Sequence, residues 1–413
     1  MSDFAIIDKC ILCSSTNLMN LFQLRDSPLA NEFVTRLDVF DRQEKFPLHL
    51  NKCSRCHHVQ LGHAVSPNRM FSNYAYVSGT AKSFVKHFHD LADQLISRWD
   101  LKSSSYVVEI GSNDGTLLKH FMDCGIPVLG VDPAANIATM ANESGVPTRN
   151  DYFTSEVASE IRLESGVADV IIANNVLAHT TLLGDIVTGV KDLLAPNGVL
   201  VFEVSYLLDV VQKLLFDTIY HEHVSYHSVK PLLLFFDHHG LELFEVEMIE
   251  SHGGSIRVYV QHKNGPREIH RSIASAIKNE DSSLLHDVST YTTMKRKIDD
   301  LNDRFRALLA KIKDSEHHIC GFGAPAKATT LMNEFNLDSN LIEFIIDDSP
   351  LKQGLFTPGL HIPIYPRNFL SERPPSHIVI FAWNFAQSII ADLKGLLGDD
   401  VTYIIPVPEL KVI

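Results

Sequence analysis

The segment Tyr106-Val-Val-Glu-Ile-Gly-Ser-Asn-Asp-Gly115 decides the fold of this chain. Its first half, Tyr106–Ile110, is a short apolar run typical of a buried strand, and the glycines that follow place a tight turn directly after it. A second apolar run, Val128–Asp132, comes one helix length later and ends in an acid. Strands that alternate with helices in this way predict a mostly parallel sheet covered on both faces.

The same alternation continues on both sides of a polar stretch at 267–313, whose apolar spacing is helical. Before that stretch the predicted strands are Asp169–Ala173, Gly198–Glu203 after the turn Ala195–Gly198, and an antiparallel edge pair made of Leu241–Ile249 and Ile256–Gln261. After it they are His318–Gly323, Leu341–Asp348, Ile378–Trp383 and Thr402–Ile405. The restarted pattern predicts a second, smaller α/β domain.

Four of the six cysteines form two matched pairs, Cys10-Ile-Leu-Cys13 and Cys53-Ser-Arg-Cys56. Two CxxC pairs supply four thiolates, the ligand set of a tetrahedral structural zinc site. Free buried thiols and a redox CxxC are the other readings, and two pairs within one short region favour zinc over both. Cys124 and Cys320 stand alone and are expected to be buried thiols.

The first glycine turn lies at the carboxyl end of its strand, where open parallel sheets hold their ligands. Gly111 and Gly115 let the backbone approach a ligand closely. Asn113 stands where a dinucleotide-binding GxGxxG turn has its second glycine, which argues against NAD at this turn.

Polar residues surround the same predicted crevice. Glu109 precedes the turn, Asp132 ends the next strand and can hold two ribose hydroxyls, and Asn174-Asn175 follow a later strand. This set favours S-adenosylmethionine (SAM) as the ligand. The alternative is a helix start that only packs on its sheet.

The second glycine turn is Gly321-Phe-Gly-Ala-Pro-Ala326, followed by Lys327, and Asp347 ends the next predicted strand. Gly321 and Gly323 fit the letter of GxGxxA, and a helix N-terminus beside Lys327 suits a diphosphate. Three readings remain open: a substrate nucleotide, which this chemistry favours, a structural turn, and NAD.

The predicted fold is α/β in three domains. Residues 1–65 form a small zinc-binding domain with short strands such as Phe46–Leu50. Residues 66–313 form a central Rossmann-like, SAM-binding domain with connecting helices, and residues 314–413 form a smaller Rossmann-like α/β domain.

Tyr220-His-Glu-His223 concentrates acid–base groups in a segment inserted after the fifth predicted strand. His223 or His221 could remove a proton, since an unperturbed imidazole titrates near neutrality, while Glu222 could orient it and Tyr220 could donate to a developing enolate oxygen. A methyl donor beside such a base favours methylation of carbon, because a carbon nucleophile must first lose a proton.

Two further histidines reach the same rim by their position in the chain. His179 follows the Asn174-Asn175 pair, and His252 precedes Gly253-Gly254, a pair that indicates close backbone approach to some neighbour. A β-bulge alone would also explain the two glycines.

Composition limits the classes of function. The 413 residues carry a formal net charge of −14, with 45% hydrophobic residues and no long basic run, which makes nucleic acid a poor partner. No apolar stretch is long enough to span a membrane, and the start lacks the pattern of a signal peptide. We expect a cytoplasmic enzyme; a monomer is compatible with the sequence, which leaves the oligomeric state open.

In this order the motifs resemble the bacterial nucleotide-sugar C-methyltransferases, SAM enzymes that methylate a ring carbon of dTDP-4-keto-deoxysugars in deoxysugar biosynthesis. The resemblance spans nearly the whole chain and rests on the two CxxC pairs, Tyr74-Ala-Tyr76, Glu109–Gly115, Asn174–His179, Tyr220–His223, His252–Ser255 and Gly321–Lys327. It implies that residues 66–313 are a class I methyltransferase domain and that the domain at 314–413 assists nucleotide-sugar binding. It also implies that His223 is the base, that C3 of the sugar is methylated through an enolate, and that Tyr220, Glu222, Tyr76 and His179 assist.

Rival functions differ in what they require. A zinc-knuckle nucleic-acid methyltransferase needs a basic track, which this acidic chain lacks. An NAD-dependent sugar oxidoreductase would use the second glycine turn, and a non-catalytic scaffold would bind without reacting. The sequence does not identify the sugar or the substituent at C3.

Overall fold

The central sheet positions the first glycine turn in this computed structural model, which describes residues 4–36, 38, 43–71, 77–80, 82–315 and 317–413. Its order is β12-β13-β10-β9-β6-β7-β8. The parallel strands are β6 (Val107–Ile110), β7 (Val128–Val131), β8 (Thr148–Arg149), β9 (Ala168–Asn174) and β10 (Leu194–Ser205). The edge strand β12 (Leu241–Ile249) and its neighbour β13 (Ser255–His262) pair antiparallel, as predicted.

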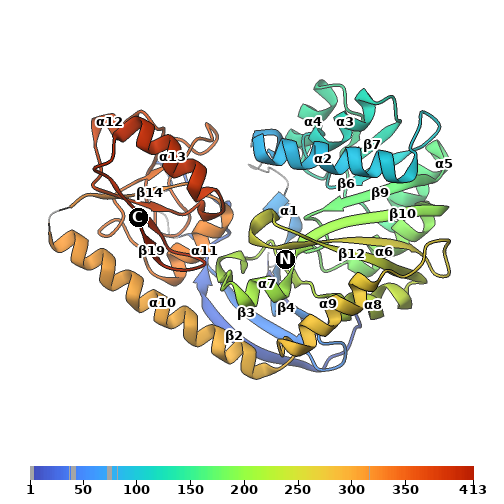
Figure 1. The fold of residues 1–413 in the computed structure, drawn as a ribbon, viewed down its shortest axis with the longest axis horizontal. Coiled ribbons are helices and arrows are strands. Elements are labelled where there is room, and N and C mark those ends of the chain that lie inside the picture. Colours follow the sequence, from blue (N-terminus) through green and yellow to red (C-terminus); the bar gives the residue numbers. More distant parts are fainter. Residues whose placement is uncertain (1–3, 37, 39–42, 72–76, 81, 316) are drawn as a thin grey trace.

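Alternate residues of these strands face opposite layers of helices. Val107 belongs to a core cluster with residues of α2 (Lys82–Trp99) and α3 (Thr116–Asp123), whereas Val108 belongs to one with residues of α5 (Ser155–Ser165) and α6 (Leu183–Leu193). Figure 1 shows α2 and α3 above the sheet and α6 with α8 (Val229–His238) below it. The predicted parallel sheet with two covered faces is confirmed.

One predicted turn is wrong in detail. Ala195–Gly198 lies inside β10, where the pairing with β9 shifts register between Leu194 and Val199. Leu194 already pairs with Ala168, so the strand begins before the predicted turn. The residues between Leu194 and Val199 form an irregularity within this long strand.

The N-terminal sheet has the order β11-β4-β3-β2, with β2 at Leu18–Ser27, β3 at Phe46–Cys53, β4 at Val59–Leu61 and β11 at Ser225–Tyr226. Strand β11 comes from the segment inserted after β10, so the chain's central part completes this sheet. A smaller sheet pairs β1 (Phe4–Ile6) with β5 (His63–Val65), and α1 (Pro67–Phe71) follows.

The C-terminal sheet has the order β16-β15-β14-β17-β18-β19. Its strands are β14 (Ile319–Phe322), β15 (Ile345–Ile346), β16 (Ile364–Tyr365), β17 (His377–Ile380), β18 (Thr402–Ile405) and the antiparallel β19 (Lys411–Val412), and its helices are α11 (Ala326–Glu334), α12 (Phe369–Glu372) and α13 (Ala386–Leu397). The predicted strand Leu341–Asp348 shrinks to β15, because Asp338 accepts the backbone N–H groups of Leu341 and Ile342 in a turn.

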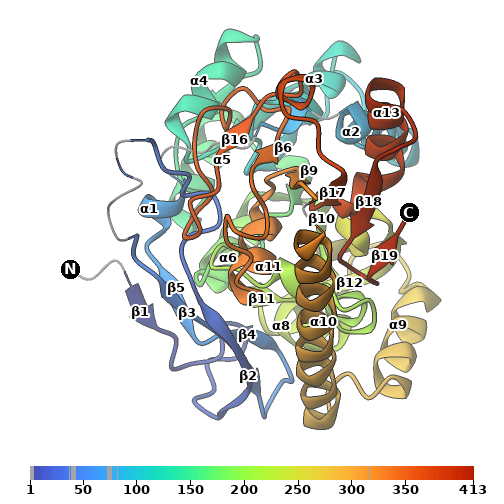
Figure 2. The ribbon, with the colours of Figure 1, turned by 90° about the vertical axis from the view of Figure 1, so that its left-hand side faces the viewer.

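Two helices, α9 (Arg271–Ser282) and α10 (Val288–Asp314), connect the central and C-terminal sheets, as the helical spacing of 267–313 predicted. In Figure 1 the central sheet and the C-terminal sheet lie on opposite sides, with α10 running below, and Figure 2 shows β2 beside α10. The domain boundaries stay a prediction. Among helices of the described residues, none combines the length and apolar character that crossing a membrane requires.

Candidate active site

The four paired cysteines converge on one point. Their Sγ atoms all lie within 4.8 Å of one another, with Cys10 and Cys56 at 3.5 Å and Cys13 and Cys53 at 3.5 Å. Ligands of a tetrahedral zinc at about 2.3 Å would lie about 3.8 Å apart, so the cluster fits that ion. Four thiolates leave no open position, which makes the site structural. Cys124, by contrast, is exposed at the end of α3 rather than buried as expected.

The first glycine turn has the backbone that its sequence requires. Gly111 and Gly115 adopt φ values of 66° and 78°. A Cβ on Gly111 would lie 2.4 Å from Cγ2 of Val176, and Asn113 also takes a left-handed φ of 50°. The turn therefore packs tightly on the loop after β9.

Buried polar atoms without partners surround this turn. Among the described residues, Glu109 Oε2, Ser112 Oγ and both side-chain polar atoms of Asn174 make no hydrogen bond. Burial, with Asp132 and Asp114 nearby, raises the pKa of Glu109 well above its usual value. A buried polar group without a partner is costly, so these atoms fit a cationic, hydroxyl-bearing ligand such as SAM.

Asp132 ends β7 as predicted, and its carboxylate already accepts two backbone hydrogen bonds. Asn113 N donates to Oδ2 at 2.9 Å and Ala134 N donates to Oδ1 at 2.9 Å. A carboxylate accepts about four hydrogen bonds, which leaves capacity for two hydroxyls. Asn175 continues the crevice with a left-handed φ of 57°, and its N–H donates to Glu203 O.

Both ring nitrogens of His223 have a hydrogen-bond partner, a backbone carbonyl at Nδ1 and the phenol of Tyr220 at Nε2. Nδ1 lies 2.8 Å from Thr218 O, which can only accept, so Nδ1 carries the proton. Nε2 is then a lone pair, 3.1 Å from Tyr220 Oη. Burial, chiefly, lowers the pKa of His223 to about 4, with Lys327 and His227 lowering it further and Thr218 O opposing them. The imidazole is therefore neutral at physiological pH.

His179 stacks on His223 with ring centroids 5.1 Å apart. Its Nε2 is buried and finds no partner in the described part of the chain. The backbone joins the two loops as well, because Ser225 N donates to Ala178 O. The loop after β9 and the inserted segment thus form one wall.

The other two members of the inserted motif face the N-terminal sheet. His221 Nε2 lies 3.3 Å from Phe46 O, and Asn31 Nδ2 donates to Glu222 Oε1 at 2.7 Å. The two middle residues of the motif thus face the N-terminal part, whereas its end residues, Tyr220 and His223, contact each other, and of the two imidazoles only His223 stacks on His179. Tyr76 lies outside the described residues.

The C-terminal part contributes a buried cation to the same neighbourhood. Lys327 Nζ lies 4.2 Å from the ring centroid of Trp383 and donates to Asn384 Oδ1. Burial lowers the pKa of Lys327, and the negative charge of Asp217 opposes this. Trp383 Nε1 in turn donates to Asp217 Oδ2 at 2.6 Å, which joins the C-terminal part to the inserted segment.

His252 lies on the same side, with its ring 5.0 Å from Phe84 and its pKa lowered to about 3, mainly by burial and then by Lys327, His223 and His87. A Cβ on Gly253 would lie 2.5 Å from Cη2 of Trp383. The close neighbour that the glycine pair predicted for the backbone is therefore Trp383, which packs against Gly253.

The second glycine turn is filled largely by the chain itself. Asp347 accepts from Ala324 N at 2.7 Å and from Ser349 N at 2.8 Å, and Lys352 Nζ donates to Ala324 O. Cβ atoms on Gly321 and Gly323 would meet Phe381 at 2.6 Å and Ala382 at 2.7 Å. Both glycines are therefore tightly packed against their own domain, and the substrate-binding role of Gly321, Gly323 and Asp347 stays a prediction.

Sequence reasoning missed Asp217, Trp383 and the pair His87–Glu203. Glu203 is buried between His87 Nε2, at 2.8 Å, and Arg257, at 2.7 Å. None of these residues belongs to a motif with fixed spacing, so only the three-dimensional structure brings them to the site. Trp383 and Glu203 each end a predicted strand, which is the signal that the sequence offered.

Comparisons with known proteins cover the whole of this architecture. Three family models match: a putative zinc binding domain at residues 10–71, a methyltransferase domain at 84–246 and a C-methyltransferase C-terminal domain at 250–408. C-methyltransferase NovU of Streptomyces niveus is 33% identical over 407 residues, which cover 98% of this chain and 97% of the relative. This chain belongs to the C-methyltransferase family. The predicted family is confirmed, and with it a SAM-dependent methyltransferase that has a zinc-binding domain.

Two solved structures are similar to part of this C-methyltransferase. Magnesium protoporphyrin IX methyltransferase of Synechocystis, with bound SAH, is 14% identical and covers 43% of this chain and 83% of its own, with a TM-score of 0.35. The PH0226 protein of Pyrococcus horikoshii is 14% identical and covers 48% and 98%, with a TM-score of 0.36.

Replacing Gly111 by alanine is expected to weaken SAM binding by tenfold or more. A left-handed φ costs an alanine about 1–2 kcal/mol, and the new methyl would also push Val176 out of the crevice wall. Gly125→Ala is the matched control, because Gly125 has a φ of 77° but open space around its Cβ position. Calorimetric titration with SAM should separate the two; equal affinities would show that the tight turn is not required for binding.

Proposed function

We propose that this C-methyltransferase transfers the methyl group of SAM to C3 of a dTDP-linked 4-keto-deoxysugar through an enolate. One observation carries the proposal. His223 has an unprotonated Nε2, and its ring stacks on that of His179, which lies in the loop after β9. Methylation of an amine or alcohol often needs little help from a base, whereas methylation of carbon next to a carbonyl needs one.

In the proposed reaction His223 Nε2 takes the proton from C3, and the electrons of the C–H bond become the enolate. Tyr220 Oη, 3.1 Å from Nε2, exchanges that hydrogen bond for one to the enolate oxygen. SAM supplies an electrophilic methyl group; C3 forms the new carbon–carbon bond as the sulfur–methyl bond breaks. His223 then releases its proton, and S-adenosylhomocysteine (SAH) leaves.

The remaining predicted residues are assigned to holding the substrates. Glu109, Asp132, Asn174 and Asn175, with the glycine turn, would bind SAM. His252 and Lys327 would line the sugar nucleotide side, and Lys327 would stabilise negative charge from a buried position, where electrostatic interactions are stronger than in water. Glu222 would act through its contact with Asn31, by fixing the inserted loop.

The low pKa of His223 has a consequence for the pH profile. The base is active when neutral, so kcat should stay level from about pH 8 to pH 5 and fall only as the pH drops through about 4. Lys327→Met removes a positive charge that lowers this pKa, so its acidic limb should move to higher pH. Lys311→Met, at an exposed position of α10, is the control. If the acidic limb of Lys327→Met lay at the same pH as that of the native enzyme, the charge of Lys327 would not affect the pKa of His223.

Mass spectrometry tests the function directly. Purified protein incubated with SAM and dTDP-4-keto-deoxysugars should add the mass of one methyl group, and fragmentation should place it on carbon 3. Methyl transfer to an oxygen or nitrogen of the sugar, or to none of the sugars, would contradict the proposal.

A further inference from the structure

A second cavity opens at the opposite end of the central sheet from the candidate active site. It has a volume of about 520 Å³, and Arg98, Trp99, Phe244, Arg267 and Ile269 are among its lining residues. Arg267 donates to the carbonyl oxygens of Asn197 and Gly198, which lie at the start of β10. The candidate active site lies beyond the other end of that strand, so the two sites are separate.

Three arginines, Arg98, Arg267 and Arg271, and two glutamates, Glu245 and Glu268, line the cavity, so its formal charge is +1. Arg98 pairs with Glu245, but neither Arg267 nor Arg271 has a carboxylate within ion-pair distance among the described residues. Arg267 is half-buried, and both burial and the charge of Arg98 lower its pKa. An unpaired, partly desolvated guanidinium in a protein of net charge −14 is complementary to an anion.

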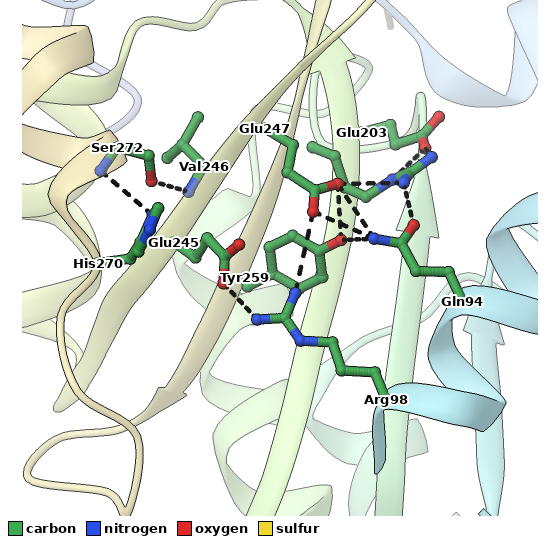
Figure 3. A network of polar contacts seen from close by, with 10 residues as sticks. Gln94, Arg98, Glu203, Glu245, Val246, Glu247, Tyr259, His270 and Ser272 are labelled. Atoms are coloured by element: carbon green, nitrogen blue, oxygen red, sulfur yellow. Dashed lines mark hydrogen bonds and ion pairs between the residues drawn. The ribbon is translucent and has the colours of Figure 1, made fainter. Parts of the chain in front are cut away.

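A network of ion pairs and hydrogen bonds holds Arg98, one of the lining residues, in place (Figure 3). Arg98 reaches Glu245 and Glu247, and Tyr259 Oη donates to Glu247 Oε2 at 2.9 Å. Because Arg98 is held by these carboxylates, the arginines left to meet a ligand are Arg267 and Arg271. His270 also lines the cavity and adds a donor, since its Nδ1 accepts from Ser272 N and its Nε2 therefore carries the proton.

The rest of the lining is apolar and aromatic. The guanidinium of Arg267 lies 5.5 Å from the ring centroid of Phe244 and 5.8 Å from that of Trp99. Ile269 keeps 55% of its surface exposed at the rim. A ligand that contacts both the arginines and the apolar lining therefore needs an anionic group attached to an apolar or ring-bearing part. A cavity of this volume is large enough for a nucleotide.

We propose that this cavity is a second ligand site, which binds a phosphate ester with a ring-bearing body through Arg267 and Arg271, with Trp99, Phe244 and Ile269 beneath the body. Guanidinium groups bind phosphate through paired N–H donors, which favours phosphate as the anion. The site is independent of the sugar substrate, because it depends on none of the residues assigned to methyl transfer.

Hydrogen exchange of the full-length protein with ADP tests the proposal, with the SAM crevice kept filled by saturating SAH. ADP should slow exchange in residues 98–99, 244–245 and 267–271 at millimolar concentration. Arg267→Gln and Ile269→Asp should each abolish this protection, while Arg296→Gln, an exposed arginine of α10, should leave it unchanged. Inorganic pyrophosphate should bind the same segments more weakly, because it has no body to cover the apolar surface.

Three results would overturn the proposal. They are the absence of protection in these segments, protection that survives in Arg267→Gln, and pyrophosphate binding as tight as that of ADP. Because Ile269 is exposed, Ile269→Asp keeps the fold and tests the site even if Arg267→Gln destabilises the protein.

Discussion

His223→Asn should lower kcat by roughly 10²–10⁴-fold while SAM binds as in the native enzyme, because a positioned general base contributes about this much. Asparagine keeps a polar group near Thr218 O and Tyr220 but has no lone pair basic enough to take a proton from carbon. The affinity for SAM should hold because the glycine turn and β9 do not depend on this side chain. Single-turnover kinetics and calorimetry give the two quantities separately.

The matched control is His238→Asn, which changes an exposed imidazole at the end of α8. It should leave both quantities unchanged. His221→Asn is a sharper comparison, because His221 belongs to the same motif but contacts Phe46 O in the N-terminal sheet. If it proved as inactive as His223→Asn while residues 219–227 kept their protection from hydrogen exchange, the base would be wrongly assigned.

Cys56→Ser should abolish turnover, although the four cysteines have no assigned part in the methyl transfer. Structural zinc binding contributes roughly 10–16 kcal/mol in small domains, so the N-terminal sheet should lose its order with the ion. That sheet holds the base loop: β11 pairs with β4, Val224 O accepts from Leu61 N, and His58 Nε2 lies 3.2 Å from Ser225 Oγ. Losing the sheet would therefore release the segment that carries His223.

Hydrogen exchange distinguishes this account from general unfolding. Protection should fall in residues 46–61 and 219–227 and persist in residues 107–131, with SAM affinity retained. Cys124→Ser, an exposed cysteine of α3, should change neither the zinc content nor the exchange. Full activity of a zinc-free Cys56→Ser protein would contradict the positioning role of the N-terminal sheet.

The sequence was sufficient where local pattern and tertiary structure agree. The turn at Gly111 was predictable because a left-handed φ at the end of a buried strand demands glycine. The cysteine cluster was predictable because CxxC spacing has few other uses. The antiparallel edge pair followed from two adjacent runs rich in β-branched and aromatic residues.

Other features depend on contacts between distant segments. Only the fold shows that His221 faces Phe46 while His223 faces His179. The strand predicted at Leu341–Asp348 failed because a hydrogen-bonded turn at Asp338 competes with extended structure for its first residues. The buried link from Trp383 to Asp217 joins residues 166 positions apart, which no local pattern encodes.

Proton exchange at C3 of the sugar tests the central claim most directly. The enzyme is incubated in D2O with a dTDP-4-keto-deoxysugar and SAH, which fills the crevice but has no methyl group to transfer. An enolate made by His223 predicts that deuterium enters C3, and that His223→Asn stops the exchange while His238→Asn does not. Two results would contradict the enolate mechanism. One is an enzyme that transfers methyl from SAM but puts no deuterium into C3 when SAH is bound; the other is deuterium exchange that survives in His223→Asn.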